Sequence, residues 1–96
     1  HINLQRLREV NEAVSIPLVL HGGTGVPAET VRNCIRGGIA KVNVGTQLHA
    51  TYLEALRGQL KPETAPNVSD VMNAVKEAIR PVVRDWIYVC RAQNRY

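Results

Sequence analysis

Two short apolar stretches that run into small polar residues decide the fold of this chain. Residues 17–25 read Pro-Leu-Val-Leu-His-Gly-Gly-Thr-Gly, and residues 38–46 read Gly-Ile-Ala-Lys-Val-Asn-Val-Gly-Thr. A short apolar run bounded by breaking residues is typical of a strand that lies in a parallel sheet and is buried on both faces. We therefore expect strands at about 17–20 and 39–44, joined by a crossover helix.

Helical segments surround these two strands. Apolar residues recur every three or four positions in four segments, at about residues 3–14, 27–36, 48–60 and 69–90. Pro27 suits the first position of the second helix, and Gly37-Gly38 suits its exit. Pro81 lies inside the last segment, where it is expected to kink or split the helix. Residues 61–66, which include two prolines, are expected to form a linker.

The length of the chain limits what it can build alone. The sequence has 96 residues, whereas a complete (β/α)8 barrel takes about 250. Two strands cannot close a barrel, so their neighbours would have to come from outside this chain. The first residue is not Met, which we take as a sign that upstream sequence is missing. We expect residues 1–96 to form a single partial domain.

The charge pattern bears on the possible binding partners of the chain, and the cysteines bear on the cellular compartment. The net charge is +4, but basic residues are mixed with acidic ones, as for Arg32 and Arg36 with Glu29. Such mixing is typical of a solvated helix face, so we expect no nucleic-acid partner. No apolar run reaches the ~18–20 residues of a membrane-spanning helix. Cys34 and Cys90 lack metal-site or disulfide spacing, which fits a reducing cytoplasm.

Polar residues at the ends of both expected strands are candidates for a ligand site. His21 stands before a glycine-rich turn, and glycine lets backbone N–H groups approach an oxyanion closely. Asn43 interrupts an apolar strand, where a buried amide is costly unless it has partners. Gly45 and Thr46 add a further backbone N–H and hydroxyl. Loops after the last two strands of barrels commonly form one phosphate site, although a glycine-rich turn alone is also ordinary turn chemistry.

These same residues carry a resemblance to a known family. Residues 17–27 and 38–46 resemble the seventh and eighth strands of class II ketose-bisphosphate aldolases, which are zinc-dependent enzymes that cleave fructose or tagatose 1,6-bisphosphate. Residues 71–96 resemble the closing helices of the family more loosely. The resemblance implies an α/β fold, namely the C-terminal fragment of a TIM (β/α)8 barrel that comprises strands 7 and 8 with flanking and terminal helices. It covers about the last third of such an enzyme.

The resemblance also implies roles for particular residues. His21 resembles a zinc-ligating histidine, and in some members the Gly22 region also meets a monovalent cation. The positions that resemble the substrate and phosphate loops are Gly22, Gly23, Thr24, Asn43, Val44, Gly45 and Thr46. No residue of this chain resembles the acid/base group, and the other zinc ligands would lie in the missing part. His1 and His49 do not match ligand positions.

Two positions depart from the family pattern. Gln47 stands where an acidic residue is usual. Residues 90–94, Cys-Arg-Ala-Gln-Asn, replace a small, glycine-containing sequence. Neither departure removes a residue that resembles a zinc-binding or substrate-binding position. Both bear on the geometry of the loops and on the choice of substrate.

The resulting functional hypothesis is a class II aldolase. The whole protein would reversibly cleave a ketose 1,6-bisphosphate to dihydroxyacetone phosphate and glyceraldehyde 3-phosphate. This chain would supply one zinc ligand and the phosphate loops, would be inactive alone, and would belong to a cytoplasmic homo-oligomer. Two alternatives stay open: a non-catalytic phosphate-binding or assembly module related to the aldolases, and a metal-free phosphate-binding barrel such as a sugar-phosphate isomerase. The choice between fructose and tagatose bisphosphate also stays open.

Overall fold

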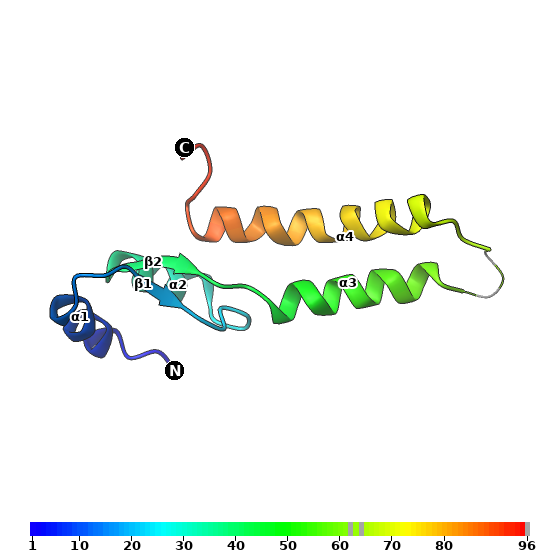
Figure 1. Cartoon of the computed structure of the whole chain (residues 1–96). Helices are drawn as coiled ribbons and strands as arrows, with labels where there is room; N and C mark the ends of the chain where they lie inside the picture. The colour runs from blue at the N-terminus through cyan, green and yellow to red at the C-terminus, as the bar shows by residue number, and fades with distance from the viewer. Residues whose placement is uncertain (62, 64, 96) are drawn as a thin grey trace. The chain divides into compact units, whose positions relative to one another are not determined.

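The computed structural model describes residues 1–61, 63 and 65–95. Its elements, in chain order, are α1 (Leu4–Ala13), β1 (Leu18–Leu20), α2 (Ala28–Arg36), β2 (Ile39–Val42), α3 (Thr46–Gln59) and α4 (Val68–Val89) (Figure 1). The chain divides into two compact units, one comprising His1–Val44 with Ile87–Tyr96 and the other Gly45–Trp86. The order of helices and strands expected from the sequence is confirmed.

The first unit is built around a parallel pair of strands. β1 and β2 pair in parallel and are joined through α2, which packs against β2, while α1 packs against α2. The side chain of Asn3 accepts a hydrogen bond from the Arg6 N–H at 3.0 Å and so caps the start of α1. Pro27 is the N-cap of α2 rather than its first helical residue, so the helix begins at Ala28, one residue later than expected.

The core of the first unit lies between α2 and β2. Val31 and Cys34 are fully buried and Ile39 nearly so, whereas Ile35 is half-buried. Val19 of β1 is 41% exposed, so the expectation that this strand is buried on both faces is wrong for this chain by itself. The described residues place only one strand beside β1. The apolar strand therefore has more hydrophobic surface than this chain can cover.

The second unit contains α3 and most of α4. Val71 and Val75 of α4 are its buried residues, and the Trp86 Nε1–H donates a 2.9 Å hydrogen bond to the Gln47 Oε1 of α3. α4 runs for 22 residues through Pro81, so of the two expected outcomes, a kink or a split, the split is wrong. Proline removes one backbone hydrogen bond from a helix. In a helix of this length, the hydrogen bonds of the turns on either side maintain the helix despite that loss. The expected linker at 61–66 includes residues 62 and 64, which lie outside the described residues.

The cysteines behave as expected from their spacing. Cys34 and Cys90 are both free thiols. Burial raises the pKa of each thiol above its usual value, because an apolar environment disfavours the thiolate. Within the described part of the chain, no helix combines the length and the apolar character needed to cross a membrane.

Two glycines in different settings give a test of this fold. Gly38 has a φ of +116°, and a Cβ there would fall inside the side-chain amide of Asn11. Gly38→Ala is therefore expected to lower the free energy of unfolding of the whole protein by about 1–3 kcal/mol. Gly58 lies inside α3, and nothing lies within 4 Å of the place that its Cβ would occupy, so Gly58→Ala should raise stability by up to about 1 kcal/mol. Urea denaturation checks both; equal effects would contradict the strained backbone at Gly38.

Candidate functional site

His21 and Asn43 meet where the two parallel strands end. His21 follows β1 directly, and Asn43 follows β2 directly. The Asn43 Nδ2 lies 3.3 Å from the His21 Nδ1, so the amide and the imidazole ring form a polar pair. His21 is exposed and Asn43 is half-buried. The convergence of these two residues, expected from the sequence, is confirmed.

A shift in strand register brings this pair together. Leu18 is paired with Ile39, but the next pairs are Val19 with Lys41 and Leu20 with Val42. One residue of β2, Ala40, is thus passed over. Continuing the shifted register places His21 beside Asn43, whereas the unshifted register would have placed it beside Val42. The irregularity therefore determines which side chain the histidine meets.

Backbone hydrogen bonds carry the strand pairing on into the glycine-rich turn. The Asn43 N–H donates to the Leu20 C=O at 2.9 Å, and the Gly23 N–H donates to the Asn43 C=O at 3.4 Å. Gly23 is buried. Gly22 has a φ of +68°, which a side chain would disfavour, and nothing lies within 4 Å of the place its Cβ would occupy. The turn is thus hydrogen-bonded to the chain that follows the second strand, while the space beside Gly22 is open.

The remaining predicted residues lie on either side of the boundary between the units. Thr24 is half-buried in the turn, and Val44 is half-buried after β2. Gly45 is the N-cap of α3 and makes no side-chain cap hydrogen bond, while its C=O accepts from the His49 N–H at 2.9 Å. Thr46 is the exposed first residue of α3. The structure thus brings His21, Gly22, Gly23 and Asn43 together in one unit, and it begins a helix at Thr46 in the other.

The site combines an imidazole ring, a side-chain amide and the backbone N–H groups of a glycine-rich turn. An exposed imidazole ring is a common zinc ligand, and in this contact the Asn43 amide N–H donates to the His21 Nδ1. The described residues contain no group of three His, Cys, Asp or Glu side chains that could hold a metal ion. The part of each residue in binding metal or phosphate stays a prediction.

Sequence reasoning missed two features of the site. The passed-over residue Ala40 carries no signal, because alanine fits any position of a short strand. The sequence marks Gln47 only as a departure from the family pattern. In the structure its Oε1 accepts the hydrogen bond from the Trp86 indole. The residue that departs from the family pattern therefore links α3 to α4.

The fold and the site together define a class of protein: an α/β protein with a histidine, an amide and a glycine-rich turn at the ends of parallel strands. Residues 1–95 match the family model described as fructose-bisphosphate aldolase class-II. The chain belongs to this family.

Two solved structures of similar fold agree with the family. The YdjI aldolase from Escherichia coli K12 is 25% identical with a TM-score of 0.83, and the match covers 99% of this chain and 36% of that one. A Coccidioides immitis protein described as a candidate fructose-1,6-bisphosphate aldolase is 28% identical with a TM-score of 0.86, covering 98% and 35%. The chain thus spans about a third of the length of these relatives.

Removing the amide that meets His21 tests the geometry of the site. Asn43→Leu eliminates the side-chain contact with the ring but keeps both backbone hydrogen bonds of residue 43. We expect the ring ¹⁵N and ¹H signals of His21 to shift in NMR spectra of the whole protein. Stability should fall by about 1 kcal/mol or less, since the contact is solvent-accessible.

A matched variant controls for the loss of an amide. Asn73→Leu removes a side chain on α4 whose Oδ1 accepts a hydrogen bond from the Lys76 Nζ at 3.3 Å. This variant should leave the His21 signals unchanged. Unchanged His21 signals in Asn43→Leu would show that the two side chains do not meet.

Proposed function

We propose that the whole protein carrying this chain is a zinc-dependent lyase that reversibly cleaves a ketose 1,6-bisphosphate. The products would be dihydroxyacetone phosphate and glyceraldehyde 3-phosphate. In this proposal β1 and β2 are strands 7 and 8 of a (β/α)8 barrel, whose active sites lie at the C-terminal ends of the strands. The observation that carries it is the meeting of His21 and Asn43 at that end of the parallel pair, 3.3 Å apart.

His21 is the residue of this chain that would hold the zinc. A catalytic zinc takes about three protein ligands and keeps an open position, so the other ligands would come from outside this chain. Zinc, when bound, supplies a Lewis acid for the carbonyl oxygen of the substrate. Asn43 contacts the ring of His21 through its amide, and the same amide would lie near a substrate bound beside the histidine.

The two turns would hold the phosphate of the triose. Gly22, Gly23 and Thr24 offer backbone N–H groups and a hydroxyl at the end of β1. After β2 the backbone of Val44 leads to Gly45 and Thr46, where α3 begins. The 14-residue helix α3 follows the N-cap Gly45, and a helix N-terminus favours an anion through its N–H groups and dipole. In this proposal a monovalent cation could also approach the Gly22 region, as in some members of the family.

The proton-transfer group would also come from outside this chain. Proton transfer in such a cleavage needs a positioned carboxylate or similar group, and none of the family's acid/base positions falls in these residues. The isolated chain is therefore expected to be inactive. We propose further that the whole protein works as a cytoplasmic homo-oligomer.

The zinc assignment predicts different outcomes for two histidines. His21→Ala in the whole protein should lower zinc content well below that of the unmodified protein and reduce kcat/KM for aldol cleavage by at least about 100-fold. Even the residues that support a metal ligand typically cost 10–100-fold when changed. His49→Ala changes an exposed histidine inside α3 and should leave zinc content unchanged.

Three results would contradict the proposal in different ways. Zinc retained in His21→Ala would show that this histidine is incidental, as in a metal-free phosphate-binding barrel. Bound bisphosphate without cleavage in the well-folded whole protein would favour the non-catalytic module. Zinc-dependent cleavage by the isolated chain would overturn the division of ligands between this chain and the rest of the protein.

The phosphate assignment predicts a separable effect on substrate binding. Thr46→Val removes a hydroxyl at the start of α3 and should raise KM for the bisphosphate about tenfold, as expected for the loss of a hydrogen bond to a charged group. Zinc content should not change. Thr51→Val removes the hydroxyl of a half-buried threonine further along the same helix and should leave KM unaltered. Equal KM values for the two variants would exclude Thr46 from the phosphate site.

A further inference from the structure

The tail that follows α4 turns back through a left-handed residue. The Arg91 N–H donates to the Tyr88 C=O at 3.0 Å, and the Ala92 N–H donates to the Ile87 C=O at 2.9 Å. This hydrogen-bond pattern is that of a Schellman motif, whose left-handed position usually holds glycine. Here the position holds Arg91, with a φ of +52°. Such a conformation is unfavourable for an arginine backbone, so the turn keeps a guanidinium where glycine would be more stable.

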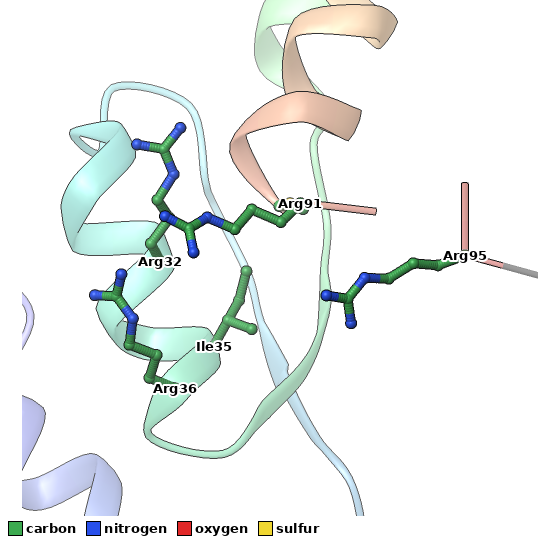
Figure 2. Close-up of a pocket in the computed structure, with 6 residues that line it drawn as sticks. Arg32, Ile35, Arg36, Arg91 and Arg95 are labelled. Atoms are coloured by element: carbon green, nitrogen blue, oxygen red, sulfur yellow. The ribbon is translucent and has the colours of Figure 1, made fainter. Parts of the chain in front are cut away.

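This turn brings arginines of the tail to arginines of α2. A hollow of about 120 Å³ is lined by Arg32, Ile35, Arg36, Cys90, Arg91 and Arg95. A second hollow, of about 340 Å³, shares three of these arginines and adds Tyr88 and Gln93. Figure 2 shows the Arg91 side chain reaching from the end of α4 toward Arg32, and Arg95 pointing toward the same region from the tail. All of these residues belong to the first unit.

The charges around this arginine pocket are not balanced. Glu29 lies 3.0 Å from Arg36 and 3.6 Å from Arg32. The hydrogen bond from Arg36 lowers the pKa of Glu29, so the carboxylate is ionised at neutral pH. Among the described residues, no carboxylate forms a salt bridge with Arg91 or Arg95. Four guanidinium groups in the described part of the chain thus share one carboxylate.

The pocket is also short of hydrogen-bond acceptors. Guanidinium groups only donate, and the Nε of Arg32 is buried without any acceptor among the described residues. The Arg32 guanidinium carbon lies 5.9 Å from the centre of the Tyr88 ring, and the arginine side chain is only 22% exposed. The aromatic contact helps to hold the cation in the pocket. A buried polar group without a hydrogen-bond partner is unusual in folded proteins.

We propose that this pocket binds a small multivalent oxyanion, namely phosphate or the phosphoryl group of a phosphorylated metabolite. Arginine suits this ligand class because its planar fork of donors matches phosphate oxygens. The ligand would supply the missing negative charge and acceptors for the exposed guanidinium groups of Arg91 and Arg95. This site is distinct from the turns at His21 and Asn43, and it does not depend on the proposed aldolase activity.

The left-handed position provides a variant that separates binding from folding. Arg91→Gly removes the guanidinium and places the preferred residue in the turn. The whole protein should therefore keep or gain thermal stability while its Kd for the anion in this pocket rises about tenfold, as expected for the loss of a hydrogen bond to a charged group. Arg95→Gln should weaken binding in the same way. Arg8→Gln removes an equal charge from an exposed position on α1 and should not change the Kd.

Equilibrium dialysis with inorganic phosphate and pyrophosphate, at ionic strength held constant with NaCl, provides the measurement. All of these variants are made in protein that also carries Thr46→Val. That substitution weakens phosphate binding at the proposed active site and leaves the arginine pocket intact. We expect Arg91→Gly, made in this background, to raise the Kd of the binding that remains about tenfold, with pyrophosphate bound more tightly than phosphate. Adding a phosphorylated metabolite as competitor distinguishes it from free phosphate.

Other outcomes would overturn the proposal. Equal binding by Arg91→Gly and the unmodified pocket would show that the arginines do not hold the anion. An equal loss of anion affinity in Arg8→Gln would show that the effect of Arg91→Gly comes from the net charge of the protein and not from the pocket. Marked destabilisation by Arg91→Gly would contradict the left-handed turn itself. Failure of this site would leave zinc content and cleavage untouched, so it is distinguishable from failure of the proposed function.

Discussion

The register between two short parallel strands is the constraint on which the site depends. Because β2 passes over one residue, the offset between paired positions grows from 21 at Leu18 to 22 at Leu20. The offset of 22 continues beyond the strands, where it sets His21 beside Asn43. Side chains alternate between the faces of a strand, so a slip of one residue would exchange the polar partner for Val42. The imidazole environment is therefore set by backbone pairing.

The sequence was sufficient for the elements of the fold but not for their burial. Apolar spacing and breakers predicted each helix and both strands, since these signals act locally. The apolar run at 17–20 also predicted burial on both faces, yet Val19 is 41% exposed. Burial depends on what lies beside a strand, and the described residues supply one neighbouring strand. Pro81 shows a second limit, because the penalty of one residue did not outweigh the long helix around it.

The two regions proposed to bind anions differ in how far the sequence could predict them. His21 and Asn43 follow parallel strands directly, so the sequence indicated that they lie at the same edge of the sheet, whereas their contact depends on the register shift at Ala40. The arginine pocket had no such signal, because the spacing of Arg32 and Arg36 with Glu29 is that of an ordinary solvated face. Those ion pairs exist. What sequence could not show is the left-handed turn at Arg91, which brings the tail back to a helix that lies more than fifty residues earlier in the chain.

The choice of residue at the end of α4 has a practical consequence for engineering. Stabilising designs commonly replace unusual residues by those best suited to the local backbone. At position 91 that criterion would select glycine, and a melting curve would score the change as an improvement. A library ranked on thermostability alone would thus discard a recognition element without any warning from the assay. Screening for retained affinity alongside heat resistance is the safer strategy at such backbone-disfavoured positions.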